Sequence, residues 1–150
     1  MKRRRSSGQS LVEFSLILPI LLLLLFGVIE FARFLFSYES LNNAVREGSR
    51  YAIVHGSSSN CPSGPVPSYV DESLNPCYDP SGTNVGNAIR KFAFTFAQSS
   101  DLVIGTPQWS PNNARGSVVT VTATYTFRLL LPLPFPPINM TATSTDVVNY

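Results

Sequence analysis

One carboxylate stands inside an otherwise apolar segment of this sequence and is the first residue that could do chemistry. Glu13 is the only charged residue between Leu11 and Ile29. An acidic side chain costs roughly 2.5 to 3.5 kcal/mol at the centre of a membrane helix, and less near its end, where Glu13 stands. Such a carboxylate either pairs with a donor or a cation, or its side chain reaches back to the lipid headgroups. Position alone leaves both interpretations open.

Two cysteines, Cys61 and Cys77, are the second candidate for chemistry. They are the only cysteines of the chain, and both follow the apolar segment. Outside the cytoplasm thiols oxidise, and closing a loop of about 15 residues stabilises a fold by about 3 kcal/mol in the chain-entropy treatment. We therefore predict a disulfide, with two free buried thiols as the alternative. His55 and the cysteines lack the spacing of a zinc site, so we expect no metal and no cofactor.

Catalytic and nucleic-acid-binding patterns are not found in the sequence. There is no G-x-S-x-G, no Walker loop and no H-E-x-x-H, so we expect neither an enzyme nor a small-molecule substrate. Four of the eleven basic residues, Lys2, Arg3, Arg4 and Arg5, precede the apolar segment. The remaining chain has seven basic and nine acidic residues, which argues against nucleic acid as a partner.

The basic cluster and the apolar segment predict a single membrane span. A helix from Leu11 to Ile29 is about 28 Å long, enough for the hydrocarbon core, and the positive-inside rule keeps the N-terminus cytoplasmic. Apolar residues continue at helical spacing beyond it, so residues 9–55 are predicted to form one transmembrane and then amphipathic helix. Pro19 is expected to kink this helix or open its hydrogen bonding. The continuing stripe consists of Phe31, Phe34, Leu35, Tyr38, Leu41, Val45, Gly48 and Ala52.

The rest of the chain predicts a small α+β domain. Residues 56–82 contain both cysteines among Ser, Pro, Gly and Asn, typical of a surface loop. Within residues 83–150 we expect a second helix over 83–98, capped by Thr83 or Asn84, with Val85, Ile89, Phe92 and Phe96 on its apolar face. It would pack on a three- to four-stranded antiparallel sheet built from residues 101–109, 117–129 and 138–150, since residues 117–129 alternate between apolar and hydroxyl side chains. The proline-rich residues 129–137 are either a loop over the core or an exposed patch for a partner or the membrane surface.

The N-terminal sequence also resembles a known family. A glycine followed by "QSLVEFSLILPI" is similar to the prepilin pattern, in which a membrane-embedded peptidase cuts after the glycine and leaves the apolar helix in the mature subunit. Over its first 55 residues, "GQSLVEFSLILPILLLLLFGVIEFARFLFSYESLNNAVREGSRYA" resembles TadE-like proteins, minor pseudopilins of the tight-adherence pilus machinery. The resemblance implies cleavage between Gly8 and Gln9 and a need for Glu13 in processing or assembly. It includes "REGSRYA", where Gly48 marks either close helix packing or a tolerated glycine.

These expectations define a leading function and an alternative. In the leading function, residues 1–8 are a basic cytoplasmic leader removed by a prepilin peptidase, and the chain assembles with other pilins and the pilus assembly platform. It would lie in the cytoplasmic membrane with its C-terminal domain outside the cytoplasm, and could enter a pilus used in adhesion or secretion. The alternative is an uncleaved single-pass anchor whose outer domain binds a component of the cell envelope.

Overall fold

The computed structural model describes residues 7–67, 77–93, 100–130 and 136–149. The chain divides into two units, residues 1–35 and residues 36–150, which are taken separately below. The first helix, α1 (Ser7–Val54), contributes residues to both units. The basic residues predicted to set the topology, Lys2, Arg3, Arg4 and Arg5, lie outside the described residues.

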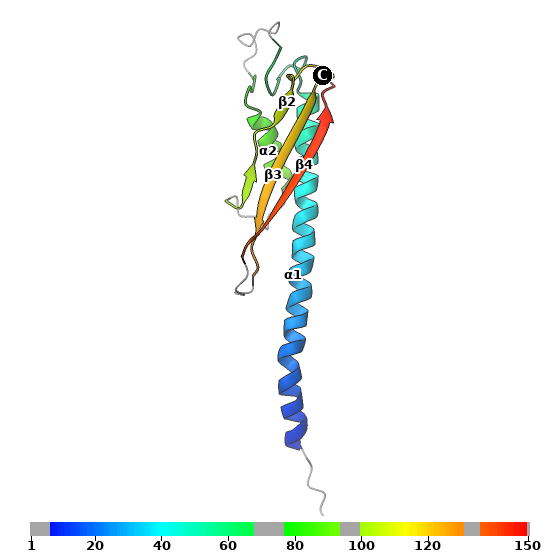
Figure 1. Cartoon of the computed structure of the whole chain (residues 1–150), viewed down its shortest axis with the longest axis vertical. Coiled ribbons are helices and arrows are strands. Elements are labelled where there is room, and N and C mark those ends of the chain that lie inside the picture. Colours follow the sequence, from blue (N-terminus) through cyan, green and yellow to red (C-terminus); the bar gives the residue numbers. More distant parts are fainter. Residues whose placement is uncertain (1–6, 68–76, 94–99, 131–135, 150) are drawn as a thin grey trace, which may run out of the picture. The chain divides into compact units, whose positions relative to one another are not determined.

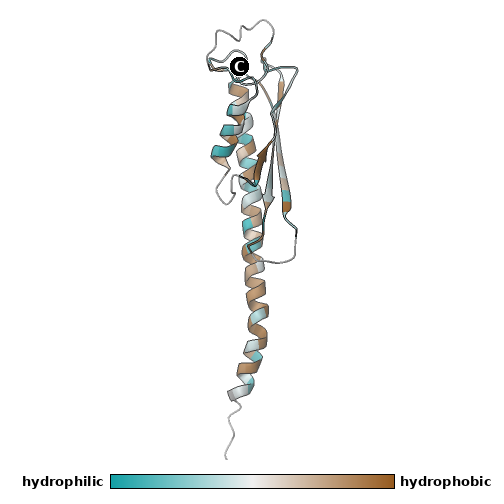
Figure 2. Cartoon of the chain, turned by 90° about the vertical axis from the view of Figure 1, so that its left-hand side faces the viewer, coloured by the Kyte–Doolittle hydropathy of each residue, from teal (hydrophilic) through white to brown (hydrophobic). Residues whose placement is uncertain are grey.

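The first unit is the apolar part of α1. Its helix continues through Pro19 without interruption. The large apolar side chains between Leu11 and Ile29 are exposed, up to 72% for Leu23, and Figure 2 shows this part of α1 mostly in the brown of hydrophobic residues. A soluble protein rarely exposes so much contiguous apolar surface. By length and composition α1 is able to cross a membrane.

The second unit is an α+β domain, as predicted (Figure 1). It contains residues 36–54 of α1, a second helix α2 (Thr83–Phe92) and a four-stranded antiparallel sheet. Strand β3 (Val118–Phe127) is central and pairs along its whole length with β4 (Ile138–Val147). On its other side β3 pairs with β1 (Leu102–Ile104) and with β2 (Gln108–Ser110).

The prediction of one strand over residues 101–109 is wrong, because that strand is interrupted. Ile104 lies opposite Ala123, and Gln108 lies opposite Thr120. Three residues of the edge strand, Gly105 to Pro107, therefore face two residues of β3, which is the geometry of a β-bulge. Pro107 lacks the amide that an uninterrupted ladder needs.

Alternation along β3 builds the core. Its odd-numbered residues are buried, and its threonines point to the other face of the sheet, as the sequence predicts. The helices lie on the apolar face: a Cβ placed on Gly48 of α1 would lie 3.7 Å from Val121, and one on Gly86 of α2 would lie 3.8 Å from Ile104. The buried β3 residues are Val119, Val121, Ala123, Tyr125 and Phe127.

Only part of the predicted stripe on α1 is buried. Leu41, Val45 and Ala52 belong to the core, together with Ala44, which the stripe omits. Tyr38 is 43% exposed, and Leu35 and Phe31 are exposed as well. Helical spacing predicts which residues share a face, but not how far along the helix that face is covered.

The second helix differs from its prediction at both ends. Gly82 takes the N-cap position with a φ of 71°. The backbone N–H of Asn84, in the first turn of α2, donates to Oδ2 of Asp79 at 2.7 Å. Neither Thr83 nor Asn84 is therefore the cap. The helix ends at Phe92, which is 44% exposed rather than buried, and Ala93 is extended. Phe96 and the rest of residues 94–98 lie outside the described part of the chain.

The proline-rich segment 129–137 stays an open prediction. Residues 131–135 lie outside the described residues, and Leu130 beside them is 71% exposed.

Candidate processing and assembly site

The residues of the predicted cleavage site lie on the first turns of α1. Gly8 and Gln9 are both helical, so the helix begins before the expected cut. The side-chain amide of Gln9 donates to Oε1 of Glu13 at 3.2 Å, one turn further along. Side chains on a helix lean toward its N-terminus, which brings the carboxylate of Glu13 back toward Gln9. Both residues are exposed.

Gly8 has no packing reason to be glycine within this fold. A Cβ added at Gly8 meets nothing within 4 Å, and its φ is not in the left-handed region. Glycine inside a helix costs about 1 kcal/mol relative to alanine. Within the described structure, packing and backbone conformation at Gly8 therefore do not require glycine.

An ion pair ends the apolar segment of α1. Nη1 of Arg33 lies 2.7 Å from Oε2 of Glu30, and Glu30 is only 8% exposed. Because charged groups are costly in hydrocarbon, the apolar span is bounded by this pair on one side. The sequence patterns predict no role for Glu30, and the only local signal is its charge directly after Ile29.

Gly48 lies where α1, α2 and β3 meet. A Cβ at Gly48 would collide with Cγ1 of Ile89 and lie 2.9 Å from its Cδ1. Both Gly48 and Ile89 are buried, Ile89 completely. Of the two interpretations of this glycine, the geometry favours close helix packing, here between two helices of the same chain.

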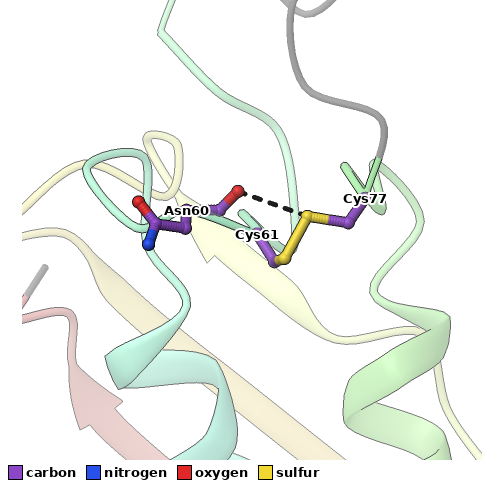
Figure 3. The surroundings of a disulfide bond; sticks show 3 residues. All are labelled: Asn60, Cys61 and Cys77. Atoms are coloured by element: carbon purple, nitrogen blue, oxygen red, sulfur yellow. Dashed lines mark hydrogen bonds between the residues drawn. A yellow bond between two sulfur atoms is a disulfide. The ribbon is translucent and has the colours of Figure 1, made fainter.

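The predicted disulfide between Cys61 and Cys77 is confirmed (Figure 3). Its Cα atoms are 5.1 Å apart, and it joins residues separated by 16 positions. Sγ of Cys77 also lies 3.2 Å from the carbonyl oxygen of Asn60, a close contact rather than a hydrogen bond because a disulfide sulfur carries no hydrogen. The bridge connects the segment after α1 to the segment that leads into α2.

Two residues that sequence reasoning missed hold these loops together. Trp109 lies against Gly64 and Gly82, and a Cβ on either glycine would lie 2.5 Å from its ring. Nδ2 of Asn113, a fully buried residue, donates to the carbonyl of Ser63 at 2.9 Å. No local pattern predicts these contacts, because they join residues 27 to 50 positions apart along the chain.

Comparison with known families supports the resemblance seen in the sequence. Residues 8–50 match the family model TadE, described as TadE-like protein. No curated protein and no solved structure matches the chain. The match begins at Gly8 and extends along α1 to Arg50. Residues 8–50 of this chain are therefore similar to the TadE-like family.

Proposed function

We propose that this chain is a membrane-anchored pseudopilin, or minor pilin, that acts in the assembly of a tight-adherence type IV pilus. The observation that carries the proposal is the TadE-like segment, which begins at Gly8 and continues along a helix able to span a membrane. In this proposal a prepilin peptidase cuts between Gly8 and Gln9. The chain has a non-catalytic role and needs no cofactor.

The geometry around Gln9 supports the proposed role of Glu13. Cleavage after Gly8 would give Gln9 a free ammonium group at the start of α1. The Gln9 side chain already reaches Glu13 at 3.2 Å, so the carboxylate lies within one helical turn of the new charge. The same carboxylate would be favoured by the positive end of the helix dipole. Pairing within the subunit, or with the ammonium of a neighbouring subunit, makes Glu13 tolerable in a bilayer.

The exposed apolar surface of α1 supports assembly with other helices. The side chains between Leu11 and Ile29 are available to lipid or to similar helices of other pilins. Helix association in a membrane depends on packing and on polar contacts, and Glu13 supplies a polar contact in this segment.

Pilus output in cells tests this function. A strain lacking the chain is complemented with wild type, Gly8→Leu or Gly27→Leu, and surface pili are quantified. Gly27 is the matched control, because it too lies in α1 and a Cβ there meets nothing within 4 Å. We expect wild type and Gly27→Leu to restore pili and Gly8→Leu to fail while still fractionating with the membrane. Full pilus output without the chain, or with Gly8→Leu, would favour the uncleaved envelope-binding anchor instead.

A further inference from the structure

The two edges of the sheet differ in how they are protected from further strand pairing. On one edge, β1 and β2 are three residues long each and are separated by the bulge at Gly105 to Pro107. Short strands, bulges and proline are the usual means of blocking an edge. The other edge, β4, is ten residues long and contains no proline, lysine or glycine. This edge therefore has none of those protections.

Hydrogen bonding shows which groups of β4 point outward. The backbone N–H of Val148, next to the end of β4, donates to the carbonyl oxygen of Ser117. Because every second residue of an antiparallel strand bonds to a given neighbour, the even-numbered residues of β4 are the ones that bond to β3. The even-numbered residues of β3 bond to the segment that contains β1, on the other side of β3. The N–H of Thr126 donates to the carbonyl of Asp101, and the carbonyl of Thr122 accepts from the N–H of Gly105. The odd-numbered residues of β4 must then direct their amides and carbonyls away from the sheet. They are Asn139, Thr141, Thr143, Thr145 and Val147, all with exposed side chains.

These outward groups are unpaired within the described residues. No backbone hydrogen bond from the odd-numbered residues of β4 is present there. Five amides and five carbonyls thus lie along one uninterrupted edge, at the spacing that an added strand requires.

The side chains of this edge define what kind of strand fits. Thr141, Thr143 and Thr145 already pair with threonines of β3, with hydroxyl oxygens 3.1 to 3.2 Å apart. An added strand would continue this hydroxyl face. The only charged residue of β4 is Asp146, so a complementary strand is low in charge.

We propose that the outer edge of β4 is a docking site for an extended strand of a partner polypeptide. The partner strand carries little charge and has hydroxyl or β-branched side chains at alternate positions. Its backbone pairs with the odd-numbered residues of β4, and its side chains extend the threonine face.

Amide hydrogen exchange of the full chain, solubilised in detergent with its disulfide intact, tests the proposal. The probe is a synthetic peptide with the sequence of residues 117–128, which is the natural antiparallel neighbour of β4. In the free protein we expect fast exchange at the odd-numbered amides of β4 and slow exchange at the even-numbered ones. The peptide should slow the odd-numbered amides by about tenfold or more.

Two variants of one residue separate the backbone edge from the side chain. Thr143→Pro removes an outward amide and leaves the bonds to β3 possible, because proline is tolerated at such an edge position. Thr143→Val keeps the amide and loses the hydroxyl. We expect Thr143→Val to bind the peptide and Thr143→Pro not to, while the even-numbered amides stay protected in both.

Three results would overturn the proposal. The first is equal peptide binding by Thr143→Pro and Thr143→Val. The second is that the peptide does not slow the exchange of any odd-numbered amide of β4. The third is that these amides already exchange slowly in the free protein. In the last case a dimer by light scattering would assign the edge to a second copy. Peptide binding needs neither cleavage at Gly8 nor a pilus, so failure here is distinct from failure of the proposed function.

Discussion

At the scale of single residues, the proposed role in assembly rests on Glu13, whose carboxylate accepts a hydrogen bond from the side-chain amide of Gln9. Glu13 is conspicuous because its charge is alone in an apolar segment, and in the structure its neighbour is Gln9, one turn away. Gly48 is conspicuous because it interrupts an apolar stripe, but Ile89, its contact, comes from a helix 41 positions later. Trp109 and Asn113 carry no such signal, since their partners are set only by the folded loops.

Replacing Glu13 tests whether its charge pairs between subunits. Glu13→Gln removes the charge, and we expect normal or improved membrane insertion but impaired assembly. The lost pairing should cost about 1 to 3 kcal/mol per contact, the range for a charge-assisted hydrogen bond. Membrane fractionation, crosslinking to the major pilin and pilus yield are the measurements. Glu39→Gln, an exposed carboxylate of α1 beyond the apolar segment, is the control. Normal crosslinking and normal pili from Glu13→Gln would show that this side chain merely reaches the headgroups.

Two glycine substitutions separate close packing from helix propensity. Gly48→Ala places a methyl group against Ile89, and we expect a net loss of about 1 to 2 kcal/mol in the free energy of unfolding. Gly86→Ala in α2 has its nearest neighbour, Cγ2 of Ile104, at 3.8 Å and should gain about 0.5 to 1 kcal/mol. Thermal or denaturant unfolding of the α+β domain within the full chain measures both. If Gly48→Ala proved as stable as Gly86→Ala, Gly48 would be a merely tolerated glycine.

At the scale of elements, periodicity predicts the long regular segments and fails at their ends. The alternation in β3 is complete, so its buried and exposed faces are both predictable. The first strand is broken because Pro107 and a one-residue shift interrupt its pairing, which alternation does not reveal. The start of α2 is fixed by Asp79, a residue several positions before the expected cap, and its end lies at Phe92 although apolar residues continue.

Removing the disulfide tests how much the loop contributes to the stability of the α+β domain. For a separation of 16 residues the chain-entropy treatment gives a loss of about 3 kcal/mol, which corresponds to a Tm lower by about 10 to 20 °C. Calorimetry with and without reductant should show this shift in wild type. The double variant Cys61→Ser with Cys77→Ser should have the lower Tm, and reductant should not change it. An unchanged Tm on verified reduction would mean that Asp79, Trp109 and Asn113 hold the loops without the bridge.

At the scale of the whole molecule, the chain combines an apolar helical segment with a small α+β domain. The sequence predicts this division from composition alone, because apolar residues concentrate before residue 30 and turn-forming residues begin at residue 56. It also predicts the TadE-like segment from the residues around Gly8. The open edge of β4 was not predictable, since it depends on which strands pair and which amides point outward.

The central claim is that the mature protein starts at Gln9, and the intact mass of the purified chain tests it most directly. The chain is expressed in the cell membrane with and without the cognate prepilin peptidase. With an active peptidase we expect a chain shortened by residues 1–8, which lowers the formal net charge from +2 to −2. A catalytically inactive peptidase should leave the chain intact, as should Gly8→Leu with the active enzyme. A mass that retains Met1 to Gly8 in the presence of a peptidase shown to cut its own pilin would contradict the account.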